Sequence, residues 1–114
     1  MHEEWREIME PDKKLLEELV KRIVAAVHPL SILLFGSAAR GAMGPNSDLD
    51  LLVVVPDGLN RRATCRLLYE RLYGLGFAKD IIVATASDIE THRDNPGLVY
   101  ARALAEGKEL YRAA

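Results

Sequence analysis

Phe35-Gly-Ser-Ala-Ala-Arg-Gly41, followed by Ser47-Asp-Leu-Asp-Leu-Leu-Val53, is the stretch that decides the fold of this chain. Both segments join an apolar run to a cluster of small or acidic residues. The run 31–35 is short, apolar and closed by Gly36, which predicts a buried strand. The run 49–55 is apolar and rich in valine, and a Pro-Asp-Gly turn ends it, which predicts a central strand.

Helices and strands alternate along the rest of the chain. Leucine, isoleucine and valine recur at helical spacing between Pro11 and Pro29, which predicts a helix with one apolar stripe. Further helices are expected from Asn60 to about Tyr73, at a capping box formed by Ser87-Asp-Ile-Glu90, and over 97–105, with strands over 79–85 and 108–111. This order predicts an α/β (α+β) fold, in which one small mixed sheet is flanked by helices. We expect residues 1–10 to be a lead-in and 11–114 to form the domain.

Length and charge narrow the classes of partner. The 114 residues are enough for one domain, and the formal net charge of -2 gives no general attraction to polyanions. Extended nucleic acids and membranes are therefore not expected partners. No apolar run approaches the ~20 residues that cross a bilayer, and the N-terminus lacks the order of a signal peptide. The single cysteine, Cys65, excludes an intramolecular disulfide, so a cytoplasmic location is expected.

Three aspartates are candidate metal ligands. Asp48 and Asp50 are two positions apart in a strand, so they face the same side of the sheet. Two close carboxylates repel each other, and a bound Mg²⁺ ion relieves that repulsion. Asp80 stands at the head of the third predicted strand. If that strand neighbours the second one, three carboxylates meet at one edge, where they can hold two metal ions for phosphoryl displacement.

Gly36, Ser37 and Arg40 are candidates for binding phosphate. Gly36 allows the backbone to approach a ligand closely, and Ser37 offers a hydroxyl and an N–H group at a helix N-terminus. Arg40 can pair with phosphate or, without ligand, with one of the two neighbouring aspartates. Ordinary structural roles are the alternatives: solvated strand-end carboxylates for Asp48 and Asp50, a strand start for Asp80, a helix cap for Ser37 and a structural ion pair for Arg40.

Gly36-Ser37-x-x-Arg40-Gly41, then Ser47-Asp48-x-Asp50-Leu51, then Asp80 in a third strand, resembles the pattern of the polymerase-β-like nucleotidyltransferase superfamily, and within it the minimal nucleotidyltransferases. The match spans residues 31–83. The resemblance implies that the Gly-Ser pair binds nucleotide phosphates and that the three carboxylates bind two Mg²⁺ ions. It also implies that the third carboxylate is a candidate base for the acceptor hydroxyl. Minimal members are commonly encoded beside a helical HEPN-domain protein in toxin–antitoxin pairs, and some transfer AMP to a tyrosine of that partner.

The leading hypothesis is therefore an enzyme that transfers a nucleoside monophosphate, expected to be AMP, from ATP or another NTP to a hydroxyl group. The resemblance implies that this chain is the antitoxin and that a HEPN-type protein carries the acceptor. Few residues follow Asp80, so we expect the acceptor on a protein surface or at a homo-oligomer interface. The alternatives are a binding module that neutralises a partner by occlusion and an antibiotic-modifying nucleotidyltransferase. The intact set of carboxylates favours the enzyme over the binding module.

Overall fold

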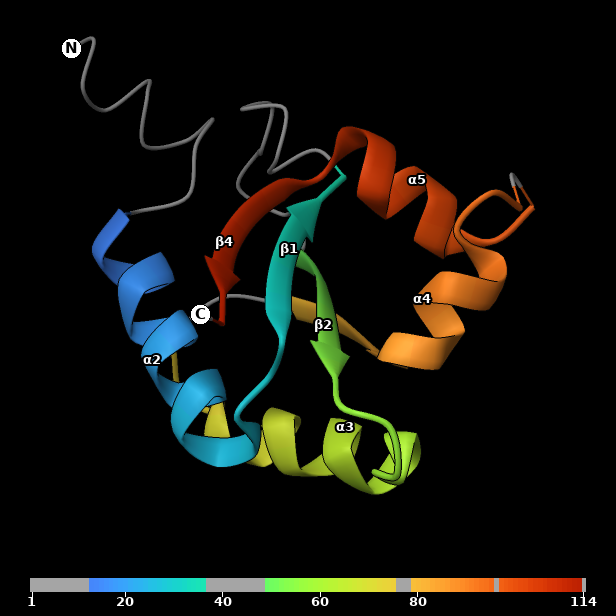
Figure 1. The fold of residues 1–114 in the computed structure, drawn as a ribbon. Helices are drawn as coiled ribbons and strands as arrows, with labels where there is room; N and C mark the ends of the chain where they lie inside the picture. Colours follow the sequence, from blue (N-terminus) through green and yellow to red (C-terminus); the bar gives the residue numbers. More distant parts are fainter. Residues whose placement is uncertain (1–12, 37–48, 76–78, 96, 114) are drawn as a thin grey trace, which may run out of the picture.

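Four strands form one mixed sheet in the order β3-β2-β1-β4 (Figure 1). The computed structural model describes residues 13–36, 49–75, 79–95 and 97–113. The strands are β1 (Ser31–Phe35), β2 (Leu49–Val55), β3 (Lys79–Thr85) and β4 (Lys108–Arg112). Strand β1 is antiparallel to both of its neighbours, whereas β2 and β3 are parallel. The parallel pair is what brings the starts of β2 and β3 to the same end of the sheet.

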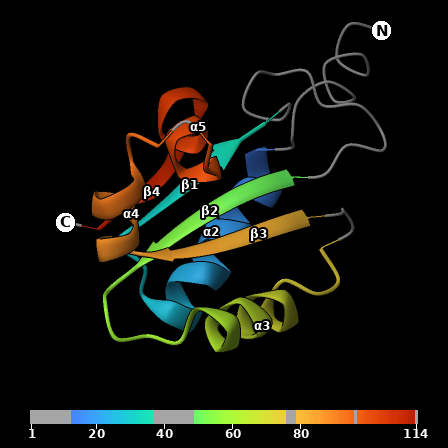
Figure 2. The ribbon, with the colours of Figure 1, turned by 90° about the vertical axis from the view of Figure 1, so that its right-hand side faces the viewer.

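Helices cover both faces of this sheet. Helices α2 (Lys13–Val27) and α3 (Arg61–Arg71) pack on one face, and α4 (Ala86–His92) and α5 (Val99–Glu106) pack on the other (Figures 1 and 2). The predicted single domain with a small mixed sheet between helices is confirmed. No helix in the described ranges combines the length and the apolar character needed to cross a bilayer.

The core divides into two clusters because β2 is an inner strand with an apolar layer on each face. Leu49, Leu51, Val53 and Val55 point toward α2 and α3, where Leu19, Ile23, Leu68 and Leu72 meet them. Leu52 and Val54 point to the other face, toward Ala103 of α5. A strand buried on both faces needs a continuous apolar run, and this explains the uninterrupted sequence 51–55.

The predicted capping box at Ser87-Asp-Ile-Glu90 is wrong, because α4 begins directly at the end of β3. Thr85 is the N-cap residue: its hydroxyl accepts a hydrogen bond from the backbone N–H of Asp88 at 3.1 Å. The Asp88 carboxylate in turn accepts from the backbone N–H of Thr85 at 3.0 Å. The motif is thus a Thr-x-x-Asp box that starts two residues earlier than predicted.

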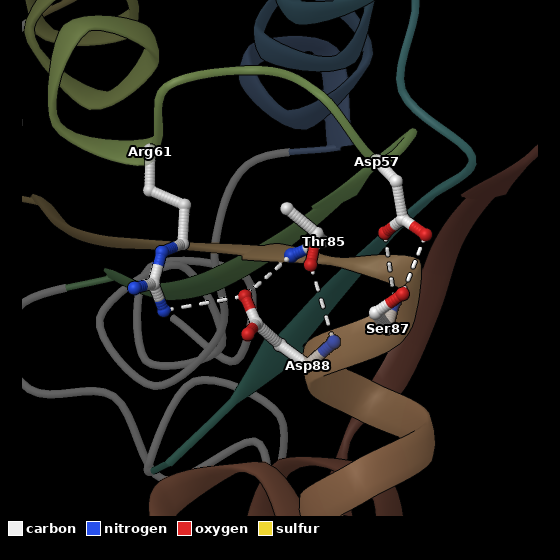
Figure 3. A network of polar contacts seen from close by, with 5 residues as sticks. All are labelled: Asp57, Arg61, Thr85, Ser87 and Asp88. Atoms are coloured by element: carbon white, nitrogen blue, oxygen red, sulfur yellow. Dashed lines mark hydrogen bonds and ion pairs between the residues drawn. The ribbon is translucent and has the colours of Figure 1, made fainter.

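A polar network links the start of α4 to the connection between β2 and α3 and to the first residue of α3 (Figure 3). Arg61 forms an ion pair with Asp88 at 3.2 Å, and Asp57 accepts hydrogen bonds from the hydroxyl and the backbone N–H of Ser87. The Ser87 hydroxyl and then its N–H lower the pKa of Asp57. The N–H of Thr85 is the largest cause lowering the pKa of Asp88. This network lies where β2 and β3 end, so it stabilises the end of the sheet opposite to Asp50 and Asp80.

Candidate active site

Three neighbouring strands place Phe35, Asp50 and Asp80 in one line across the sheet. Phe35, the last residue of β1, is the register partner of Asp50 in β2. Asp50 is in turn the register partner of Asp80 in β3. The prediction that Asp80 lies beside the second strand, at the edge where that strand begins, therefore agrees with the register. Figure 2 shows β2 and β3 lying side by side.

The side chains of Asp50 and Asp80 lie on the same face of the sheet. Adjacent register partners direct their side chains to the same side, and alternate residues of one strand share a face. Phe35, Leu52 and Ile82 all contribute to the core beneath α4 and α5, so the two aspartates belong to that face. Asp80 is exposed and Asp50 is partly buried. The two carboxylates therefore stand next to each other at an accessible end of the sheet.

Gly36 follows β1 directly and lies against Asp50. Its φ angle is 73°, in the left-handed region that favours glycine. A Cβ atom added to Gly36 would overlap Oδ2 of Asp50. Two independent constraints, backbone conformation and space, thus require glycine at this position. From the sequence, we expected Gly36 to let the backbone approach a ligand closely. The structure shows that its backbone lies close to the carboxylate of Asp50.

The other expected site residues, Ser37, Arg40 and Asp48, lie outside the described residues. Within the described ranges two of the three expected carboxylates are brought together, and no group of three candidate metal ligands is found there. Two adjacent carboxylates, one of them exposed, supply the oxygen donors that Mg²⁺ prefers. The donor set of Asp50 and Asp80 therefore fits a hard divalent cation.

Helix α3 contributes two contacts beside Asp80 that the sequence did not reveal. The backbone N–H of Ile81 donates to the Tyr69 hydroxyl at 2.9 Å, and the Cys65 thiol donates to the Ile81 carbonyl at 3.5 Å. Burial, and then the negative charge of Asp80, raise the pKa of that thiol. Neither Cys65 nor Tyr69 stood out in the sequence as a residue of the site. Their spacing of four residues places both on one flank of α3 and was the available signal.

The comparisons with known proteins agree with this arrangement. The model of the nucleotidyltransferase domain family matches residues 13–104. A search of curated proteins finds no significant match. Among solved structures, a toxin–antitoxin complex with AMP-PNP is 22% identical, with a TM-score of 0.66 over 86% of this chain and 73% of that chain.

Two further structures share the fold. The toxin–antitoxin MntA-HepT is 19% identical, with a TM-score of 0.62 over 90% of this chain and 74% of that chain. A protein from Sulfolobus solfataricus, proposed to be a nucleotidyltransferase, is 22% identical, with a TM-score of 0.59 over 87% of this chain and 78% of that chain. The family model covers most of the sequence, and the geometry of Gly36, Asp50 and Asp80 lies within it. The chain therefore belongs to the nucleotidyltransferase domain family.

Proposed function

We propose that this nucleotidyltransferase transfers AMP from ATP, with Mg²⁺, to a hydroxyl group of a partner protein. The observation that carries the proposal is the register pairing of Asp50 with Asp80, at the sheet end where Gly36 closes β1. Purely structural aspartates have no need to be neighbours on one face, where their charges repel. A site that binds a cation and phosphates does need such neighbours.

Each residue has a role in this proposal. Asp50 and Asp80, with Asp48 from the sequence motif, would hold Mg²⁺, and two ions are expected from three carboxylates. When bound, the metal supplies positive charge that stabilises the phosphate oxygens. Gly36, Ser37 and Arg40 would bind the phosphates of the nucleotide. The alternative to ATP is another NTP.

The proposed reaction is a single displacement at the α-phosphorus of ATP. The oxygen of the acceptor hydroxyl forms a bond to the α-phosphorus, and the bond from that phosphorus to the bridging oxygen of the leaving group breaks. Pyrophosphate leaves with the electron pair of that bond. Asp80 is exposed, so its carboxylate is the one that an acceptor can reach, and it takes the proton of the hydroxyl.

The partner proposal rests on the relatives. Two of the similar structures are toxin–antitoxin complexes, and one of them contains AMP-PNP, an ATP analogue. By that analogy this chain acts on a toxin partner as its antitoxin. The motif resemblance adds the proposal that the partner is a helical HEPN-type protein, and the single cysteine adds the proposal of a cytoplasmic location. The experiment must distinguish this proposal from two alternatives. One is a binding module that neutralises its partner by occlusion, and the other is an antibiotic-modifying nucleotidyltransferase.

The test uses ATP labelled at either the α- or the γ-phosphate. The purified chain is incubated with Mg²⁺ and the co-expressed product of the neighbouring gene, and separately with an aminoglycoside. We expect the α-label, and not the γ-label, to appear on the protein partner. Transfer of the γ-label would indicate a kinase reaction. Label on the aminoglycoside alone would favour the antibiotic-modifying enzyme. Tight complex formation without any transfer would favour occlusion.

A further inference from the structure

Strand β3 lies at the edge of the sheet, and α3 lies beside it (Figure 2). The N–H of Ile81 is bound by the Tyr69 hydroxyl and its carbonyl by the Cys65 thiol. Both backbone groups of this one residue therefore point away from β2 and toward α3. Because successive residues of a strand direct their backbone groups to opposite sides, the flanking residues Asp80 and Ile82 are turned toward β2.

The head of an edge strand is the part of a sheet that frays most easily, since one of its sides has no neighbouring strand. Asp80 is the second residue of β3 and is exposed, so packing of its own side chain does little to hold it. The next residue, Ile81, is buried and bound on both of its backbone groups. The position of Asp80 is thus set by β2 on one side and by α3 on the other.

We propose that Tyr69 is a positioning residue which, with Cys65, fixes the backbone of Ile81 and so holds the carboxylate of Asp80 beside that of Asp50. The inference rests on the proposed function in one respect, the use of Asp80 in metal binding. The clamp itself consists of the two hydrogen bonds from α3 to the backbone of Ile81.

The chain contains a matched control for this proposal. Tyr73 lies four residues after Tyr69, just beyond the end of α3, and is 85% exposed, whereas Tyr69 is 41% exposed. The Tyr73 hydroxyl makes no hydrogen bond within the described part of the chain, whereas that of Tyr69 accepts from Ile81. Tyr69→Phe and Tyr73→Phe remove the same atom from the same region, but only the first removes the acceptor for the Ile81 N–H.

The experiment measures amide hydrogen exchange and Mn²⁺ binding by NMR on the full chain. We expect Tyr69→Phe to speed exchange of the Ile81 amide by up to about tenfold, the range set by one ordinary hydrogen bond. We also expect Mn²⁺ to broaden the amides of Asp50 and Asp80, and its apparent Kd to rise by up to about tenfold in Tyr69→Phe. In transfer assays, the Mg²⁺ concentration for half-maximal rate should rise, while KM for ATP at saturating Mg²⁺ stays the same. Tyr73→Phe should match the wild type in every measurement.

Wild-type exchange and wild-type Mn²⁺ affinity in Tyr69→Phe would overturn the proposal. Faster exchange with unchanged Mn²⁺ affinity would also overturn it, because the clamp would then be merely structural. If Mn²⁺ does not broaden Asp80 even in the wild type, the metal role of Asp80 and the proposed function are what fail. Cross-strand NOEs between Asp80 and β2 then test the clamp separately. The clamp predicts that these NOEs weaken in Tyr69→Phe and persist in Tyr73→Phe.

Discussion

At position 36 the lack of a side chain is what leaves room for the carboxylate of Asp50. Replacing Gly36 by alanine costs about 1–2 kcal/mol of stability because of its positive φ, and it also forces Asp50 to move. Gly74→Ala is the control, since Gly74 has φ 88° and nothing within 4 Å of an added Cβ. In denaturant titrations we expect Gly36→Ala to lose at least as much unfolding free energy as Gly74→Ala, with nucleotide transfer abolished only in Gly36→Ala. Equal transfer in both variants would refute the role given to Gly36.

The carboxylate of Asp50 is predicted to serve the reaction more than the fold. A metal ligand can contribute several kcal/mol to charge stabilisation in the transition state. Its removal is therefore expected to lower the transfer rate roughly 10²–10³-fold. We therefore expect Asp50→Asn to lower transfer by about that factor while keeping a cooperative melting transition. Asp94→Asn, which changes an exposed aspartate after α4, should leave the rate unchanged. An active Asp50→Asn enzyme would remove this residue from the metal site.

At the scale of elements, the start of α4 depends on two aspartates whose pKa values are lowered in the folded protein. Asp88 accepts from the N–H of Thr85 and pairs with Arg61, and Asp57 accepts from Ser87. A lowered pKa means that the folded state favours the charged form. The resulting stabilisation is present above the ordinary value of 3.8 and is lost as the pH falls below it.

We predict that urea unfolding gives a nearly constant free energy of unfolding between about pH 7 and pH 5, which then decreases below about pH 4. In Asp88→Asn the stability at neutral pH is lower, and the decrease toward low pH is smaller, because one of the two groups no longer titrates. Asp94→Asn should retain the full wild-type decrease. A wild-type acid profile in Asp88→Asn would show that the network in Figure 3 does not stabilise the fold.

At the scale of the whole molecule, nucleotide binding should stabilise the native state, because the proposed site exists only where three strands meet. At an ATP concentration tenfold above Kd, the gain is about 1.4 kcal/mol, which raises Tm by several degrees for a domain of this size. The measurement is a thermal melt with ATP in Mg²⁺ and in EDTA, with Asp50→Asn as the comparison. We expect a shift only for the wild type with Mg²⁺. An equal shift in EDTA would contradict a metal-dependent site.

Local patterns of sequence determined the elements. The bounded apolar runs located β1, β2 and β3, and the helical stripe located α2, because burial requires apolar residues at the period of each element. The ordered motif of Gly36 and the strand-head aspartates indicated the family, which the family model confirmed. The α4 capping box was misplaced because two overlapping four-residue frames, one from Thr85 and one from Ser87, both fit the capping pattern. Only the point where β3 ends selects between them.

The tertiary structure alone decided which residues meet. The residues that surround Asp50 and Asp80 in the sequence do not reveal that β2 and β3 are parallel neighbours, or that their register pairs these two aspartates. That register follows from packing the alternating faces of both strands against two helical layers, because a slip of one residue would turn every side chain to the wrong face. The same packing lays α3 along β3 and brings the Tyr69 hydroxyl to the backbone of Ile81. The sequence by itself determined the strands and the acids at their heads, and long-range packing determined that those acids are neighbours.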